Sequence, residues 1–387
     1  MVEELANINS NTRNLEGLAR LTEALKPYLM KLDSNVESVP LGSERIIDSQ
    51  GRDVSYPLAP AIRVRKRTSA PLQVFLNIHI DTVYPKEDPF QKVEQIDADT
   101  LRGPGVIDAK GGVVVLLTSL EAVERSGLAQ NMGWEVFLNT DEEIGSPGSS
   151  GYFAEAARRH HLALLFEPSM PDGALVGERK GSGNFSLVVR GRAAHAGRDF
   201  AAGRNAVVAA CEFAVDVHRF NGTISDATLN VARIEGGGPA NVVPDLGICR
   251  LNARVSRRED QGKIESELAR LANGVARRHE VTAQLHGHFS SPPKQLDAPT
   301  RALAGHIEAC GRELNIPITW RSSGGASDGN KLAAAGLPVI DTLGPVGADL
   351  HSPNEHLVLS SLAERAKLAA LVLLKLATGA LPWPPAR

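Results

Sequence analysis

Cysteine is scarce in this chain. The 387 residues include only Cys211, Cys249 and Cys310, and their spacing is not that of a cysteine metal site. A disulfide framework is therefore not expected. The N-terminal stretch MVEELANINSNTRN is polar and lacks the basic-then-apolar pattern of a secretory signal. We therefore expect a cytoplasmic protein.

Long hydrophobic runs and an excess of one charge are also lacking. The apolar stretch from Leu368 to Leu376 contains Lys375 and is too short to span a bilayer, so it predicts a buried helix. A net charge of −3 gives no reason to expect a nucleic-acid or membrane partner. With 42% hydrophobic and 22% charged residues, the composition is typical of a globular protein, and the length favours two domains.

Three apolar runs each end at residues that can bind a metal. The runs are Leu72 to Ile80, Trp134 to Thr140 and Leu162 to Phe166, and they are typical of buried parallel strands. Because ligands bind at the C-terminal ends of strands in open α/β sheets, we expect the residues there to share one rim. They are His79, Asp81, Glu142, Glu143 and Glu167.

Two further candidates lie in loops. Asp108 belongs to the glycine-rich stretch GPGVIDAKGG, and His351 to HSPNEH, where His356 could compete with it. Two histidines and several carboxylates can fill two metal sites if one carboxylate bridges, and a metal pair activates water. Of the adjacent Glu142 and Glu143, one could bind a metal while the other acts as a general base. Asp81 could bind a metal or instead hydrogen-bond to His79, and the spacing leaves both open.

An inserted domain is predicted between the metal-binding segments. From Gly183 to Phe289 the pattern is β-α-β-β-α-β, which forms a four-stranded sheet with helices on one face, and none of the candidate ligands falls in it. We therefore expect a catalytic domain made of residues 1–180 and 291–387, and an inserted domain of residues 181–290. Hinges near 177–183 and 290–295 would let the inserted domain close on a substrate.

Eight short stretches together resemble the M20 metallopeptidases. In chain order they are HIDTV, GPGVIDAKGG, TDEEIGS, FEP, GRAAHAG, ANVVPD, SGGASDG and HSPNEH, running from residue 79 to 356. The resemblance implies an α/β fold: a mixed-sheet zinc-peptidase catalytic domain with an inserted ferredoxin-like (βαββαβ) domain. In the family this insertion is a lid and often the dimerisation surface, so the resemblance implies a homodimer.

The resemblance also implies roles for individual residues. Two zinc ions would be bridged by Asp108, one also bound by His79 and Glu167 and the other by Glu143 and His351; Co²⁺ or Mn²⁺ could replace zinc. Glu142 would be the general base and Asp81 would orient His79. The remaining matches are His195, which would stabilise the oxyanion, commonly in the partner subunit, and the substrate-binding positions Asn241 and Arg254.

The substrate expected from the resemblance is a small N-acyl amino acid or peptide with a free carboxylate. Arg254 and the loop containing Gly324 and Gly325 favour such a carboxylate. We expect a carboxypeptidase G2-like enzyme that releases a C-terminal amino acid. The alternative is an N-acyl-amino-acid deacylase of the aminoacylase or acetylornithine deacetylase kind. A two-metal phosphoesterase would be expected to carry more basic residues in these loops, and a non-catalytic homologue to lack a ligand or the base.

Overall fold

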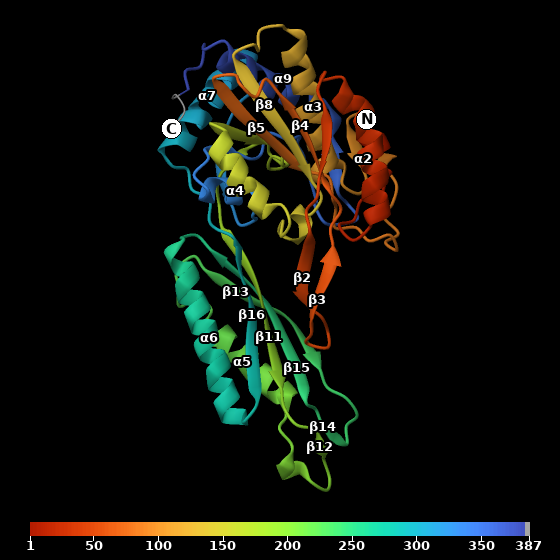
Figure 1. Cartoon of the computed structure of the whole chain (residues 1–387), viewed down its shortest axis with the longest axis vertical. Coiled ribbons are helices and arrows are strands. Elements are labelled where there is room, and N and C mark those ends of the chain that lie inside the picture. Colours follow the sequence, from red (N-terminus) through yellow and green to blue (C-terminus); the bar gives the residue numbers. More distant parts are fainter. Residues whose placement is uncertain (384–387) are drawn as a thin grey trace.

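The computed structural model describes residues 1–383 and shows an elongated molecule with two bodies (Figure 1). The upper body contains the N-terminus and the end of the described chain, and the lower body is built from the middle of the sequence. This is the mixed α/β architecture that the sequence predicts. Within residues 1–383, none of the helices has the length and apolar character needed to cross a membrane.

The upper body is centred on a mixed six-stranded sheet with the order β1-β4-β8-β5-β9-β18. Neighbours β8, β5, β9 and β18 run parallel, whereas β4 is antiparallel to both β8 and β1. The three apolar runs are strands β5, β8 and β9, as predicted, and their C-terminal ends meet at one edge. The bounds are β1 Val36–Val39, β4 Ala61–Lys66, β5 Leu72–His79, β8 Met132–Asn139, β9 Leu162–Leu165 and β18 Val339–Ile340.

Helices cover both faces of this sheet because its strands are apolar on both sides. On one face, Leu76 and Val136 belong to a core that includes residues of α2, α3, α7 and α9. On the other, Phe75 and Phe137 pack with α4 and α8. The bounds are α2 Leu15–Met30, α3 Gly112–Arg125, α4 Ser150–Arg159, α7 Ala298–Leu314, α8 Asp328–Ala334 and α9 Leu359–Ala377.

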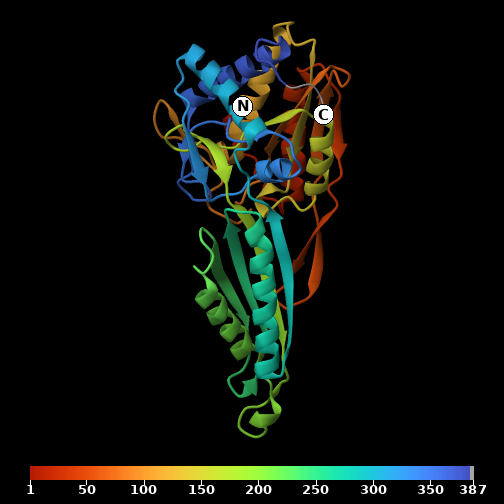
Figure 2. The same cartoon turned by 90° about the vertical axis from the view of Figure 1, so that its left-hand side faces the viewer.

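The lower body is a four-stranded antiparallel sheet of order β13-β15-β11-β16, with two helices on one face (Figure 2). Its chain order is the predicted β-α-β-β-α-β. Phe185, Leu187 and Leu251 face the helices in a separate apolar core. The bounds are β11 Gly181–Arg190, α5 Ala206–Phe220, β13 Thr228–Gly236, β15 Leu246–Val255, α6 Glu259–His279 and β16 Thr282–Ser291.

Two chain crossings connect the bodies, and they lie side by side. Arg179 leads into the lower body and Lys294 returns from it, and their backbones exchange hydrogen bonds of 2.9 and 3.0 Å. Both side chains contact Asp341, which follows β18: Arg179 Nε lies 2.8 Å and Lys294 Nζ 3.1 Å from its carboxylate. The crossings are thereby anchored to the edge of the upper sheet.

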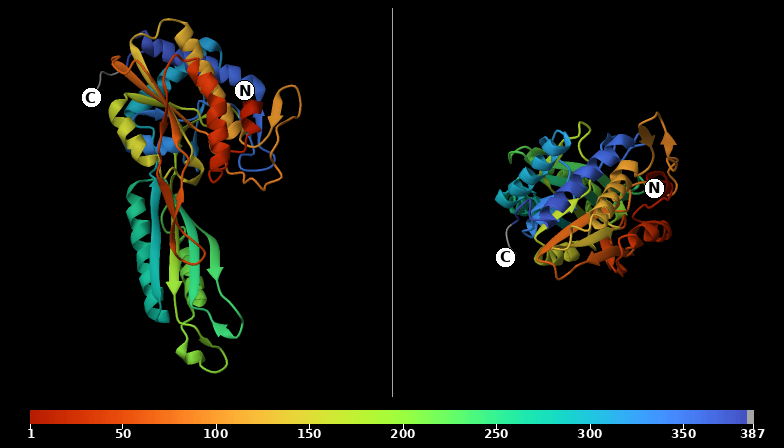
Figure 3. Two further views of the ribbon diagram at one scale, coloured as in Figure 1. Left: turned by 45° about the vertical axis from the view of Figure 1, so that its right-hand side comes forward. Right: turned by 90° about the horizontal axis from the view of Figure 1, so that it is seen from above.

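A hairpin from the upper body adds a further connection. Strands β2 (Ser43–Ile47) and β3 (Asp53–Pro57) run down beside the lower sheet (Figure 3). At its tip, Arg250 Nη1 donates to the carbonyl of Ile47 at 2.9 Å, and Arg190 Nη2 to that of Gly51 at 2.9 Å. A side chain at Gly51 would come within 2.7 Å of Val188, so glycine allows this close approach. The hairpin thus covers part of the face of the lower sheet that the helices leave open.

Short elements complete the described chain. Three small sheets pair β10 with β17, β12 with β14, and β19-β20-β7-β6 in that order. Their bounds, with those of the short helices, are α1 Val2–Ala6, β6 Glu94–Gln95, β7 Thr100–Arg102, η1 Val106–Gly111, η2 Glu142–Ile144, β10 Leu175–Arg179, β12 Ala194–His195, η3 Phe200–Ala202, β14 Val242–Val243, β17 Trp320–Ser323, β19 Gly347–Ala348 and β20 His356–Val358.

Candidate active site

The carboxylate of Asp108 lies between two histidines. His79, the last residue of β5, places Nε2 3.0 Å from Asp108 Oδ1, and His351 places its Nε2 3.2 Å from Asp108 Oδ2. Asp108 itself is held in the η1 segment, with Gly105 before it in the left-handed conformation at φ 72°. Each oxygen of one carboxylate therefore faces a different imidazole, which is the arrangement needed for a bridging ligand.

Two glutamates complete this cluster. Glu167 Oε2 is 3.7 Å from His79 Nε2, and Glu143 Oε2 is 3.2 Å from His351 Nε2. Glu143 Oε1 and Glu167 Oε1 are buried, and neither has a hydrogen-bond partner among the described residues. Ligand atoms of His79, Asp108 and Glu143 lie within 4.8 Å of one another. Unpartnered buried oxygens beside imidazole nitrogens fit a site for divalent metal, since N/O donor sets of this kind suit zinc.

The site concentrates negative charge in a buried place. Burial raises the pKa of Glu167 to about 8, with Asp108 adding to the shift and His79 opposing it. Burial also raises the pKa of Glu143 to about 7, again with a contribution from Asp108. The hydrogen bonds of His351 to Asp108 and Glu143 raise the pKa of that imidazole to about 10. Bound cations would relieve the repulsion among these carboxylates.

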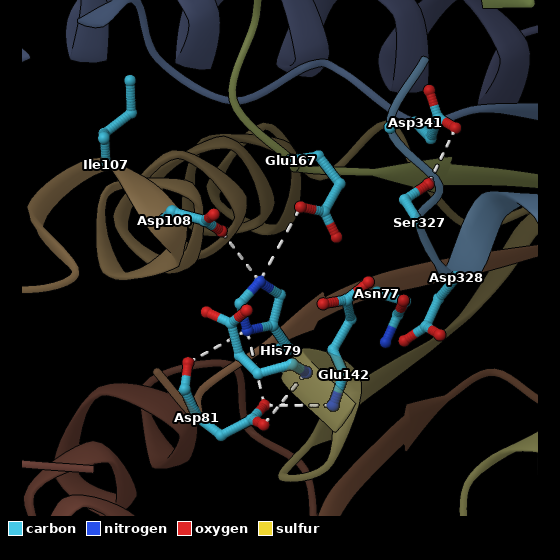
Figure 4. Close-up of polar contacts among 12 residues, drawn as sticks. Asn77, His79, Asp81, Ile107, Asp108, Glu142, Glu167, Ser327, Asp328 and Asp341 are labelled. Atoms are coloured by element: carbon cyan, nitrogen blue, oxygen red, sulfur yellow. Dashed lines mark hydrogen bonds and ion pairs between the residues drawn. The ribbon is translucent and has the colours of Figure 1, made fainter. Parts of the chain in front are cut away.

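Glu142 points into the same cluster (Figure 4), and its backbone is held by Asp81. The N–H groups of Glu142 and Glu143 each donate to the Asp81 carboxylate at 3.2 Å, and Thr12 Oγ1 donates to it at 2.7 Å. His79 Nδ1 lies 3.0 Å from the carbonyl oxygen of Asp81 and 3.4 Å from its carboxylate. Burial raises the pKa of Glu142 well above its ordinary value.

Arg254 reaches the glycine loop from the lower body. Its Nη1 donates to the carbonyl of Gly324 at 3.3 Å, and its Nε to Asn252 at 2.9 Å. Gly325 accepts from Arg179 Nη1 at 3.1 Å. Gly324 lines a cavity of about 380 Å³, whose other lining residues include the cationic Arg179, Lys180, Arg257 and Lys294. The negative charges of Glu167 and Glu142 contribute to raising the pKa of Arg179, although neither glutamate lines the cavity itself.

His195 and Asn241 lie together, but far from this cluster. His195 on β12 pairs with Val242 on β14, and the Ala196 N–H donates to the Asn241 carbonyl at 2.9 Å. Both side chains are exposed, at the end of the lower body that points away from the upper one (Figure 1). Within one chain, these two residues therefore do not approach His79 or Glu142.

Sequence patterns did not identify several buried charged residues around the site. Asp328 accepts from Asn139 Nδ2 at 2.7 Å, from Lys331 Nζ at 3.0 Å and from the Ser146 hydroxyl. Glu355 accepts from backbone groups next to Asp108. Each lies inside a stretch singled out by its glycine or histidine content. The burial of these two acids could not be predicted from the sequence, because burial of a loop carboxylate depends on hydrogen-bond donors from distant segments.

Comparison with known proteins gives concordant results. The sequence model of peptidase family M20/M25/M40 matches residues 75–375. Carboxypeptidase G2 of Pseudomonas sp. (strain RS-16) is 27% identical over 384 residues, which cover 98% of this chain and 89% of that protein. Succinyl-diaminopimelate desuccinylase of Alkalilimnicola ehrlichii is 29% identical over 323 residues, covering 77% of this chain and 82% of the relative.

Solved structures share the fold. The M20 metallo-carboxypeptidase Sso-CP2 of Sulfolobus solfataricus matches with a TM-score of 0.73 at 16% identity, covering 97% of this chain and 98% of that one. A tripeptidase of Staphylococcus aureus matches with a TM-score of 0.74 at 20% identity, covering 97% and 96%. The predicted family and fold are thus confirmed. The protein is a hydrolase of amide or peptide bonds, and it belongs to peptidase family M20/M25/M40.

Proposed function

We propose that the protein is a two-zinc hydrolase that releases a C-terminal amino acid from a small N-acyl or peptide conjugate, as a carboxypeptidase G2-like enzyme. The observation that carries the proposal is the position of Asp108 between His79 and His351, with unpartnered oxygens of Glu143 and Glu167 beside them. These five residues would hold the two ions. Co²⁺ or Mn²⁺ would suit the same donors.

The residues of this chain would divide the chemistry as follows. Two bound divalent cations would polarise the substrate carbonyl and make water acidic enough to attack near neutral pH. Glu142 would take the proton of the attacking water and return it to the leaving amine. Asp81 would fix the backbone of Glu142 and the ring of His79. His195 would donate a hydrogen bond to the oxyanion that forms on the attacked carbon.

A free carboxylate on the substrate is supported by the cationic cavity. Gly324 and the cationic Arg179 line it, and Arg254 donates to the Gly324 carbonyl. We propose that these groups bind the substrate carboxylate, with Asn241 contributing from a partner subunit. The cavity opens between residues 181–290, for which we propose the role of lid, and the catalytic residues 1–180 and 291–387.

A homodimer through the lid is supported by exposed apolar residues. Val208 and Val215 are 50% and 47% exposed and lie two turns apart on α5. Ile234 is exposed on β13, which is an edge strand of the lower sheet and therefore has unpaired backbone groups on one side. We propose that a second copy covers this surface. The proposal also accounts for His195 and Asn241, which would then serve the partner's site.

An N-acyl-amino-acid deacylase is the second candidate, and the desuccinylase relatives favour it. Both reactions cleave an amide bond and differ in which side of it is recognised. Membership of the family argues against the phosphoesterase alternative, and the full set of ligand and base residues argues against a non-catalytic homologue.

The test is hydrolysis of a panel by zinc-loaded protein. The panel contains N-acyl glutamates, dipeptides, N-acetyl amino acids and N-succinyl-diaminopimelate. We expect Glu142→Gln to lower the rate by ~10²–10⁴-fold while both metals stay bound. Glu155→Gln on α4 is the control, because that side chain is 66% exposed. A Glu142→Gln variant with wild-type rates would contradict the mechanism, and the preferred substrate would separate the two candidates.

A further inference from the structure

Glu355 is a buried carboxylate that none of the roles above uses. It is fully buried and lies four residues after His351. Its Oε2 accepts the hydroxyl of Tyr84 at 2.5 Å, and its Oε1 accepts the backbone N–H groups of Ile107 and Asp108 at 3.1 and 3.2 Å. Three donors from two distant segments therefore satisfy one carboxylate.

These contacts join the segments that carry the proposed metal ligands. Tyr84 follows Asp81 by three residues, on the chain leaving β5 and His79. The Tyr84 hydroxyl also lies 3.0 Å from the carbonyl of Ser352, the residue after His351. The Gly103 N–H donates to the Glu355 carbonyl at 3.1 Å, which is a third hydrogen bond between Glu355 and the Asp108 loop.

His351 depends on such support because its backbone is unfavourable. It adopts a left-handed conformation at φ 60°, and so does Asp349 at the same φ. For a residue other than glycine this conformation costs about 1–2 kcal/mol, so the surrounding contacts must hold it. The Glu355 N–H closes the turn by donating to the Ser352 carbonyl at 3.1 Å.

We propose that Tyr84 and Glu355 are positioning residues, which set the separation of Asp108 and His351 and thereby the affinity of the metal site formed by Asp108, Glu143 and His351. The inference rests on the metal centre of the proposed function. Tyr84 and Glu355 are neither proposed metal ligands nor the proposed base. They act through the Asp108 backbone and the His351 turn.

The experiment compares Glu355→Gln and Tyr84→Phe, which nearly conserve volume, with a matched pair elsewhere. The half-buried Tyr152 donates to the buried Glu135, which also pairs with Arg159, and Tyr152 stacks on Phe137 on the face of the sheet that α4 covers. Tyr152→Phe and Glu135→Gln therefore report the general cost of losing such a bond. Metal affinity is measured for the full chain by titrating Zn²⁺ against a chromophoric chelator, and Co²⁺ absorption reports ligand geometry.

We expect Glu355→Gln to lower the Zn²⁺ affinity of the site formed by Asp108, Glu143 and His351 by about 10- to 100-fold. The same variant should alter the Co²⁺ absorption spectrum. Tyr84→Phe should act in the same direction to a smaller extent. At saturating zinc, kcat should recover. The Tyr152 and Glu135 variants should lose thermal stability without a change in metal affinity or spectrum.

Wild-type affinities and spectrum in Glu355→Gln, with or without a lower melting temperature, would overturn the proposal. So would equal losses of affinity in the control pair. If the wild-type protein bound no metal, the proposed centre would fall together with the positioning role. Absence of amide hydrolysis with two ions bound would count against the proposed function alone, because the affinity measurement does not depend on turnover.

Discussion

Asp81 holds the backbone of Glu142, since its Oδ1 accepts the Glu142 N–H at 3.2 Å while its Oδ2 accepts the next N–H along the chain. The same carboxylate lies 3.4 Å from His79 Nδ1. One side chain thus connects the C-terminal ends of β5 and β8, where a proposed metal ligand and the proposed base lie. These contacts fix the backbone of Glu142 and lie beside the ring of His79.

Asp81→Asn is expected to keep both metals while lowering kcat by about 10- to 100-fold, because the amide weakens the bonds that orient His79 and Glu142. Metal content by elemental analysis and steady-state kinetics on the same preparation check this. Loss of one metal in Asp81→Asn would instead identify Asp81 as a ligand.

Arg254→Ala is expected to raise KM by about 10- to 100-fold with little change in kcat, since a charged hydrogen bond to the substrate carboxylate would be lost. Arg233→Ala provides the control, because that arginine is 67% exposed on the neighbouring strand β13. An unchanged KM for every carboxylate substrate would exclude the binding role of Arg254.

Mixed dimers test whether His195 serves the partner's site. His195→Ala and Glu142→Ala are each expected to be nearly inactive as homodimers. In a mixed dimer, the chain that keeps Glu142 would receive the intact His195 of the other chain, so unfolding and refolding the two together should restore activity. No recovery, despite mixed dimers confirmed by mass, would show that His195 does not act across the interface.

Glu124 should contribute to stability in a pH-dependent way. Although burial acts to raise its pKa, hydrogen bonds from Arg67, Trp134 and Lys66 lower the pKa of Glu124 to about 2. A carboxyl with a lowered folded-state pKa stabilises the fold fully above its unfolded pKa, near 4.5, and loses this contribution as the pH falls towards the folded value.

Glu124→Gln is therefore expected to lower the free energy of unfolding by about 2 kcal/mol near neutral pH. The difference from wild type should shrink as the pH falls below about 4.5. Denaturant unfolding at several pH values measures it, with Glu121→Gln on the same helix as the control. A difference that stays constant with pH would show that the charge of Glu124 is not responsible.

The strands bearing the ligands could be predicted because burial on both faces leaves an apolar run. Such runs end where the chain meets solvent or ligand, and His79 and Glu167 stand at those ends. The order of strands and helices in the lower body was predicted from the apolar pattern along each segment. Periodicity in a strand or helix is a local property, so one sequence contains it.

The remaining features depend on contacts between distant segments. Glu355 is separated by more than 240 residues from the N–H groups that it accepts, and nothing near it in sequence indicates burial. The remote position of His195 follows from the length of the lower sheet and the pairing of β12 with β14. The contacts of the β2–β3 hairpin depend on where the lower body lies, which the residues of the hairpin do not encode.

That hairpin would restrict any rotation of the lower body relative to the upper one. If the two adjacent segments at Arg179 and Lys294 were the sole connection, they would act as a hinge axis between the bodies. The hydrogen bonds from Arg190 and Arg250 to the hairpin tip form a second contact between the bodies, away from that axis. A rotation would then have to break these hydrogen bonds or bend the hairpin. The bending stiffness of the β2–β3 hairpin would therefore add to the free-energy cost of moving the two bodies apart. Because these hydrogen bonds go to backbone carbonyls, most side-chain substitutions in the hairpin would preserve them. A larger residue at Gly51 would instead clash with Val188 and separate the hairpin from the lower sheet.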